Sequence, residues 1–127
     1  MNFISIEDVI DINEILEKES KGVIKPNELE SAIVSIRQSM YGTYLYDSIY
    51  RMASHLTCSH CFSDGNKRTS VLSGIRFLEM NGIHFKENKQ IELSKKILDV
   101  TTHKMSEDEY TQYLIDNCYW HSYFILL

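Results

Sequence analysis

Apolar residues recur at spacings of three and four along most of this chain, and its single proline is Pro26. This spacing places the apolar side chains on one face of a helix, whereas a half-buried strand would show strict alternation. No proline-, glycine- or serine-rich stretch marks a linker, so we expect one all-α domain over residues 1–127. The clearest stripes are Val9, Ile12 and Leu16; Leu29, Ala32, Ile33, Ile36 and Met40; Leu45, Ile49, Met52, Ala53 and Leu56; Val71, Leu72, Ile75 and Leu78; and Tyr110, Tyr113 and Leu114.

Polar residues beside these stripes predict where the helices begin and end. Two pairs have the spacing of a capping box, in which a serine hydroxyl and an acidic side chain bond to free backbone N–H groups at a helix start. These pairs are Ser5 with Asp8 and Ser106 with Glu109. Pro26 suits a first helical turn, and Asn81 followed by Gly82 is a helix stop signal. Residues 83–85 after that stop are predicted to be extended.

Charge and cysteine content narrow the class of protein. The net charge of −5 disfavours direct binding to nucleic acid, which needs a basic surface. Three cysteines and the lack of a charged-then-apolar leader disfavour a secreted disulfide fold. The longest apolar run, residues 124–127, is too short to cross a bilayer. We therefore expect a soluble cytoplasmic protein with a core of its own.

The segment SHCFSDGNKRTS at 59–70 gathers the chemistry-bearing residues, immediately before the apolar stripe that begins at Val71. This order predicts a loop that ends at a helix N-terminus, where free N–H groups and the helix dipole favour an anion. Gly65 and Asn66 tolerate positive φ, so neighbouring N–H groups can curl around a phosphate, and Arg68 can bind phosphate oxygens with two parallel hydrogen bonds. Asp64 can hold a divalent cation that bridges phosphates. Histidine titrates near neutral pH, so His60 is the candidate general base.

The same residues resemble the signature of the Fic/Doc family, H-x-F-x-[DE]-G-N-G-R-x-x-R. The matching positions are His60, Phe62, Asp64, Gly65, Asn66 and Arg68. Lys67 stands in place of the second glycine and Val71 in place of the final arginine, and both changes are typical of the Doc (death-on-curing) branch. FLEMNG at 77–82 and NELESAI at 27–33 also resemble Doc segments, whereas the last third of the chain carries no family signature.

The resemblance implies a helical Fic/Doc fold of about six helices, with the motif loop leading into a central helix. It also implies ATP and Mg²⁺ as cofactors, with Gly65, Asn66, Lys67 and Arg68 on the nucleotide phosphates. Asp64 would hold the metal, His60 would deprotonate a protein hydroxyl, and Phe62 would anchor the loop. Fic enzymes attach AMP, whereas in the Doc branch Lys67 goes with an inverted nucleotide and transfer of the γ-phosphate. We therefore favour a kinase over an AMP transferase.

Substrate and partner also follow from the Doc resemblance. The implied substrate is a threonine of translation elongation factor Tu, and its modification would arrest protein synthesis. Many Fic proteins carry an inhibitory helix with the pattern [ST]-x-x-x-E-[GN], which this sequence lacks. Inhibition in trans by a Phd-type antitoxin, folded onto an apolar groove, is therefore implied.

Other interpretations of these residues remain open. Asp64 would serve as a plain helix cap, Asn66 as a turn residue, and Lys67 with Arg68 as a solvated pair. Thr69 and Ser70 could touch phosphate or only begin the helix, and the aromatic cluster at 41–46 could bind substrate or pack internally. A zinc module is a rival class, with His55, Cys58, His60, Cys61, Cys118 and His121 as its candidate ligands. A Fic-fold binding protein without activity is a further alternative.

Overall fold

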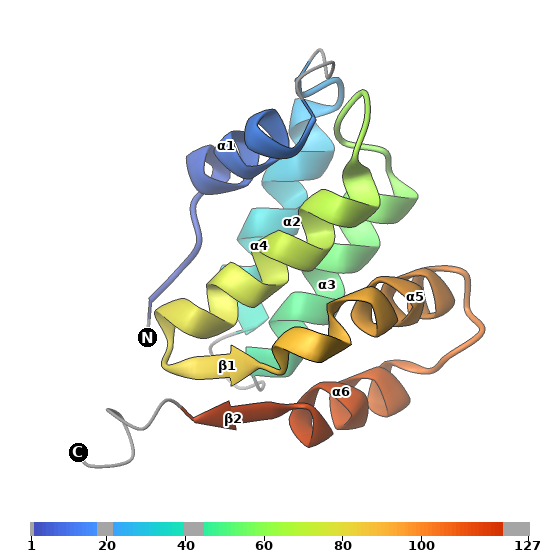
Figure 1. Cartoon of the computed structure of the whole chain (residues 1–127). Coiled ribbons are helices and arrows are strands. Elements are labelled where there is room, and N and C mark those ends of the chain that lie inside the picture. Colours follow the sequence, from blue (N-terminus) through green and yellow to red (C-terminus); the bar gives the residue numbers. More distant parts are fainter. Residues whose placement is uncertain (1, 18–21, 40–44, 121–127) are drawn as a thin grey trace.

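The computed structural model describes residues 2–17, 22–39 and 45–120 (Figure 1). These residues form six α-helices, a 3₁₀ turn and two short strands, which confirms the predicted all-α fold. In chain order the elements are α1 (Ile6–Leu16), α2 (Pro26–Ser39), α3 (Leu45–Cys58), α4 (Asn66–Met80), β1 (Ile83–Phe85), η1 (Glu87–Lys89), α5 (Gln90–Thr101), α6 (Glu107–Asp116) and β2 (Cys118–Trp120).

Helix starts follow the local signals in the sequence. Ser5 and Asp8 form the predicted capping box, with the Asp8 N–H donating to Ser5 Oγ and the Ser5 N–H donating to Asp8 Oδ2, both at 3.1 Å. Helix α2 begins at Pro26, as expected. Ser106 caps α6 by accepting from the Glu109 N–H at 3.1 Å, which is the serine half of the second predicted box.

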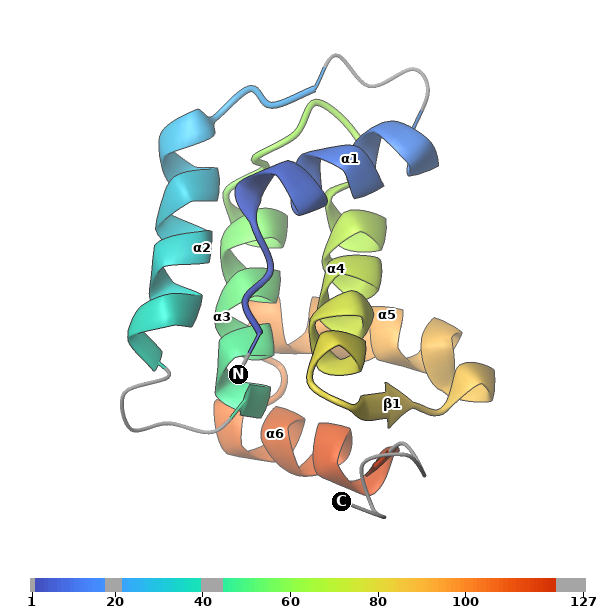
Figure 2. The ribbon, with the colours of Figure 1, turned by 90° about the vertical axis from the view of Figure 1, so that its left-hand side faces the viewer.

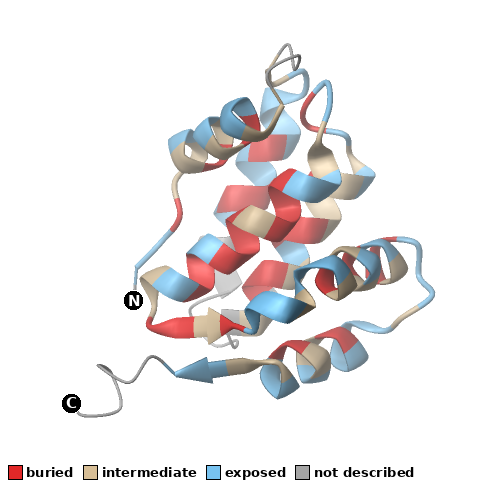
Figure 3. Cartoon of the chain, in the orientation of Figure 1, coloured by how far each residue is buried: buried red, intermediate tan, exposed pale blue. Residues whose placement is uncertain are grey.

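Helix α3 lies at the centre of the molecule and packs against α2, α4, α5 and α6. Figure 2 shows α2, α3 and α4 running side by side, with α1 crossing near the upper ends of α3 and α4. Figure 3 shows buried residues concentrated along α4 and on the helix faces turned toward it. The fully buried side chains include Met52, Leu56, Phe62, Phe77 and Tyr110. Complete burial of one such apolar side chain contributes about 1.5–3 kcal/mol relative to exposure, so this core supplies much of the stability.

Helices α3 and α4 approach closely because α4 carries small residues on its inner face. Ser70, Ser73 and Gly74 of α4 are all buried. A Cβ atom built on Gly74 would lie only 3.0 Å from Cγ2 of Ile49 on α3. Glycine is therefore the residue that fits this contact, and the close packing fixes the motif helix against the core.

The short strands lie at the end of α4 that is opposite the motif loop (Figure 1). Helix α4 stops at Asn81 and Gly82, as predicted, and the extended segment Ile83–Phe85 becomes β1. It pairs antiparallel with β2, with Ile83 opposite Trp120 and Phe85 opposite Cys118. Strand β2 was not predicted. The motif loop 59–65 lies at the other end of α4, away from this two-stranded sheet.

No helix within the described ranges is long and apolar enough to span a membrane. Most of the aromatic cluster at 41–46, together with Met40 and His121, lies outside the described residues.

Candidate active site

The loop 59–65 joins α3 to α4, and backbone hydrogen bonds fix it to the segment that precedes α2. The Ile24 N–H donates to the Cys61 carbonyl at 2.9 Å, and the Ser63 N–H donates to the Gly22 carbonyl at 3.1 Å. Phe62 is 1% exposed and belongs to the hydrophobic core. These bonds and the burial of Phe62 therefore hold the loop in place on both sides of Phe62.

Asn66 closes the same loop from the start of α4. Its Nδ2 donates to the Phe62 carbonyl and its Oδ1 accepts from the Phe62 N–H, both at 2.9 Å. These two bonds use both polar atoms of the Asn66 carboxamide to hold the loop. The group that Asn66 leaves for an anion is its backbone N–H, one of the first-turn donors that lack a partner within the helix.

The N-terminus of α4 has the features of an anion site. Gly65 is the N-cap with φ of +74°, a left-handed conformation that glycine adopts without a steric penalty. It has no side chain, and no other side chain in the described part of the chain caps this helix. The positive end of the helix dipole therefore faces the loop cavity, and the exposed Lys67 adds a full positive charge beside it.

His60 lies on the rim of this cavity in a strained backbone conformation. Its φ is +51°, and such a conformation costs a non-glycine residue about 1–3 kcal/mol. The cavity encloses about 480 Å³, and Asp64, Gly65, Lys67 and Arg68 line it together with His60. The sequence-predicted base, metal ligand and phosphate-binding residues are therefore brought together around one hollow.

Glu17 lines this cavity beside Arg68, and sequence reasoning missed it. Its Oε1 lies 2.7 Å from Arg68 Nη1, and the Glu17 side chain is 18% exposed against 61% for Arg68. A Cβ atom built on Gly65 would clash with Glu17 Cγ, so Glu17 packs directly on the N-cap. A carboxylate at the end of α1 thus stands where the helix N-terminus and Arg68 favour an anion.

Asn13 was also missed and ties α1 to the motif. It is fully buried, and its Nδ2 donates to the Asp64 carbonyl at 2.9 Å and to Thr69 Oγ1 at 3.0 Å. Thr69 and Ser70 are fully buried, and Ser70 Oγ bonds to the Asn66 carbonyl at 2.9 Å. Neither residue lines the cavity that contains His60. The interpretation in which Thr69 and Ser70 only begin the helix therefore fits the structure.

Asp64 is exposed, and its Oδ1 accepts from the Gly65 N–H at 2.8 Å. It does not cap α4 by the usual bond to a first-turn N–H. No group of three or more histidine, cysteine or acidic residues that could hold a metal ion occurs in the described ranges. Mg²⁺ commonly takes one or two carboxylates and completes its shell with water and phosphate oxygens, so Asp64 fits a metal that arrives with a nucleotide.

Comparison with known families agrees with this geometry. The sequence model of the Fic/DOC family matches residues 3–78, which is more than half of the chain and includes the whole motif loop. The chain belongs to the Fic/DOC family. Members of this family are typically transferases that attach AMP or a phosphoryl group to proteins. A comparison with curated proteins finds no match.

One departure from the wider Fic/DOC pattern has a structural consequence. Val71, in place of the final arginine, is 6% exposed and faces a second cavity beside Arg68. At position 71 this chain therefore has an apolar side chain in the wall of the second cavity, whereas the family pattern has a second cation there. The family match ends at residue 78, so it does not cover β1, α5, α6 or β2.

The rival zinc interpretation finds no support around the Fic/DOC motif. Cys58 Sγ lies 3.2 Å from the Thr101 carbonyl, and Cys61 Sγ lies 3.5 Å from the His55 carbonyl. The two thiols thus bond to different backbone groups. Burial raises the pKa of the Cys61 thiol to about 11, which disfavours the thiolate that zinc requires.

Proposed function

We propose that this chain is a Doc-type toxin that transfers the γ-phosphate of ATP to a hydroxyl of a translation factor. The supporting observation is that His60, the α4 N-terminus and Arg68 line one cavity. A transferase needs a base for the hydroxyl and fixed positive charge for the phosphates within reach of each other. Translation elongation factor Tu, modified on a threonine, is the proposed substrate, and the cytoplasm is the proposed site of action.

In the proposed reaction, the first-turn N–H groups of α4, Lys67 and Arg68 neutralise the nucleotide phosphates. Bound Mg²⁺, held by Asp64, would supply further positive charge on the phosphate oxygens. His60 accepts the proton of the target hydroxyl as its oxygen forms a bond to the γ-phosphorus. The bond from that phosphorus to the β–γ bridging oxygen breaks, and ADP leaves. Val71 and Lys67, which replace an arginine and a glycine of AMP-transferring relatives, favour this outcome over AMP transfer.

We also propose control by a partner in trans, of the Phd-antitoxin type. A groove of about 420 Å³, separate from the cavity that contains His60, runs between α1 and α4, with Ile12, Ile15 and Ile75 among its apolar residues. Ile15 is 76% exposed, so its side chain is available for an amphipathic segment. Acidic residues also line this groove, which favours a segment with basic residues flanking its apolar face. The acidic members are Asp8, Asp11 and Glu79.

Two labels on ATP test the reaction. The chain is incubated with Mg·ATP and elongation factor Tu, in one sample with ³²P at the γ-position and in another with ³²P at the α-position. We expect label on the factor from the γ-position only. Label from the α-position would make the protein an AMP transferase and refute the kinase proposal.

The variant His60→Ala tests whether the toxic effect depends on catalysis. Losing a positioned general base costs ~10²–10⁴ in rate, so the variant should not label the factor and should not arrest growth when expressed. Replacement of His103 by alanine, in the turn after α5 and not among the residues that line the cavity containing His60, is the matched control and should behave like the wild type. Equal toxicity of a folded His60→Ala protein would show that toxicity does not require transfer.

A further inference from the structure

The cavity that contains His60 has an apolar residue in its wall, and this residue comes from α5. Leu98 is the only residue with a hydrocarbon side chain among the described residues that line the cavity, and it is 44% exposed. A single exposed leucine on an ordinary surface needs no explanation. In a cavity suited to phosphates it has a consequence, because a hydrocarbon side chain offers a phosphate neither a hydrogen bond nor a charge. This part of the wall is therefore left for an apolar group.

Leu98 belongs to the end of the cavity where α3 and α5 meet. The thiol of Cys58, two residues before His60, lies 3.2 Å from the Thr101 carbonyl. Leu98 precedes Thr101 by three residues, or about 4.5 Å along the helix. Ile97, the neighbour of Leu98, is fully buried, so core packing fixes α5 beside the loop. Leu98 is thus held on the side of the cavity that adjoins the candidate base.

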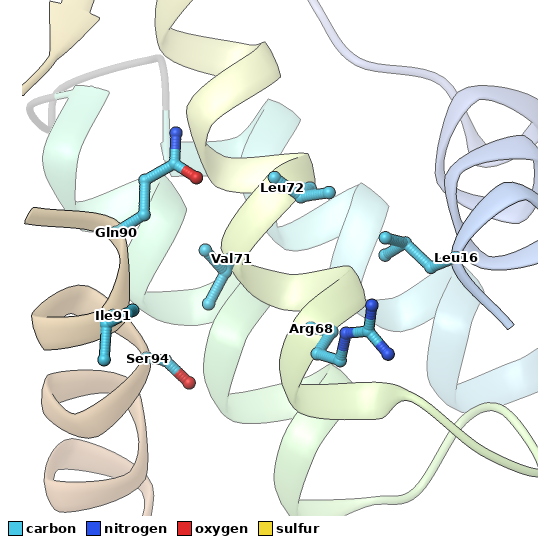
Figure 4. Close-up of a pocket in the computed structure, with 7 residues that line it drawn as sticks. All are labelled: Leu16, Arg68, Val71, Leu72, Gln90, Ile91 and Ser94. Carbon is cyan, nitrogen blue, oxygen red and sulfur yellow. The ribbon is translucent and has the colours of Figure 1, made fainter. Parts of the chain in front are cut away.

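The groups assigned to the phosphates lie toward the other side of α4. Figure 4 shows α5, with Ile91, on one side of α4 and α1, with Leu16, on the other, and the Arg68 guanidinium is turned toward α1. There Arg68 Nη1 lies 2.7 Å from Glu17 Oε1. The cavity therefore extends from Glu17 at the end of α1, across the N-terminus of α4, to Leu98 of α5.

We infer that Leu98 is a specificity-determining residue that contacts the acceptor side chain of the protein substrate. This inference rests on the proposed function and adds to it the side from which the substrate approaches, over α5, and a physical reason to prefer threonine to serine. Threonine carries a methyl group on the carbon that bears its hydroxyl, and serine does not. With this methyl group against Leu98, the hydroxyl is left to face His60. The Fic/DOC family match ends at residue 78, so it does not include this residue.

The ratio of kcat/KM for two acceptors tests the inference. The acceptors are elongation factor Tu and the same protein with its labelled threonine replaced by serine, each with Mg·ATP. Leu98→Ala should lower the threonine-to-serine ratio about fourfold relative to the wild type, the value of one methyl group taken out of water. The intrinsic reactivity of the two alcohols is the same for every variant, so it cancels. Leu98→Met, which conserves volume, should keep the ratio within about twofold of the wild type.

A matched control and a binding measurement accompany these variants. Ile115 of α6 is 45% exposed and does not line the cavity, so Ile115→Ala should leave the ratio unchanged. Titration calorimetry separates the acceptor from the nucleotide, because Leu98→Ala should bind Mg·ATP as tightly as the wild type. Circular dichroism checks the fold, and Leu98→Gln, which keeps the length of the side chain but not its apolar character, replaces the alanine variant if that protein is unfolded.

The possible outcomes are distinct. An unchanged ratio in the folded Leu98→Ala or Leu98→Gln protein overturns the inference. Weaker binding of Mg·ATP by the same protein would place Leu98 against the nucleotide and would overturn it as well. If the wild type labels neither acceptor, the proposed function itself fails, which is a different result.

Discussion

At the residue scale, the Glu17 carboxylate adds a negative charge to the proposed phosphate site, next to Arg68. Arg68 and the N-terminus of α4 favour an anion, and the Glu17 carboxylate provides one from within the chain. Because a phosphate and this carboxylate would bind the same groups, the proposed binding of a nucleotide requires Glu17 to leave Arg68. The pair is largely exposed on the arginine side, so it is weak enough to be displaced.

Glu17→Gln should therefore increase the affinity for Mg·ATP by about fivefold. Nucleotide binding to the variant no longer has to break an exposed ion pair of ~0.2–1 kcal/mol, and the repulsion between the carboxylate and the phosphates is removed. Titration calorimetry measures the change, and Glu14→Gln, an exposed position on the same helix, is the control and should not alter it. An unchanged or weaker affinity in Glu17→Gln would mean that the carboxylate does not compete with phosphate.

Cys61 allows a prediction about pH. Burial, with the nearby Glu28 carboxylate as a smaller cause, raises the pKa of its thiol to about 11, against an ordinary value of about 8.5. At a pH between these two pKa values, the Cys61 thiol loses its proton in the unfolded chain and keeps it in the native chain. The Cys61 contribution to stability is thus complete below about pH 8.5 and is lost as pH rises toward 11.

Urea unfolding of wild type and Cys61→Val at pH 8 and pH 10 isolates this effect. The free energy of unfolding of wild type should fall more than that of the variant, by at most about 1.4 kcal/mol per pH unit. Equal losses in the two proteins would show that Cys61 does not titrate in this window.

At the scale of elements, the site depends on α1 lying across the start of α4. This contact joins residues 51 to 56 positions apart in the chain, through Asn13 to Asp64 and Thr69 and through Glu17 to Arg68. Local signals fixed the predicted helix starts at Ser5 and Pro26, but no local pattern marks such distant partners. Helix α1 therefore does more than cover the core: it positions the motif loop.

Asn13→Ala should destabilise the fold by about 1–3 kcal/mol, because Thr69 Oγ1 and the Asp64 carbonyl lose their donor. It should also speed amide hydrogen exchange in the loop 60–65, a local effect that a general loss of stability does not produce alone. Asn88→Ala, at an exposed position in η1, is the control. Unchanged loop exchange in Asn13→Ala would contradict the positioning role.

At the scale of the whole molecule, the sequence predicted the helical class, several helix starts and the motif residues that line the cavity. Helix α5 was missed although Leu93, Ile97 and Val100 have helical spacing, so that signal was present and unused. Strand β2 could not be predicted, because its three residues become a strand only by pairing with β1. The motif does not predict which groups the Asn66 side chain bonds to, nor that Glu17 lies in the cavity. Both depend on how distant parts of the chain come together in the folded structure.

The central claim is that nucleotide phosphates bind at the start of α4, and ligand-dependent thermal melts test it most directly. Mg·ATP at 100 times its Kd should stabilise the wild type by about 2.7 kcal/mol, a rise of several degrees in Tm. Arg68→Lys loses the bidentate contact and Asp64→Asn loses the charge that Mg²⁺ requires. Both variants should gain clearly less with ligand, while their melts without ligand stay close to the wild type.

The control substitutions keep the same chemistry outside the cavity: Arg76→Lys on α4 and the exposed Asp108→Asn on α6 should gain as much as the wild type. The predicted result is a loss of the Mg·ATP shift confined to Arg68→Lys and Asp64→Asn. If these two variants shift as far as the wild type and the controls, the phosphates bind elsewhere, and the account of this site is wrong.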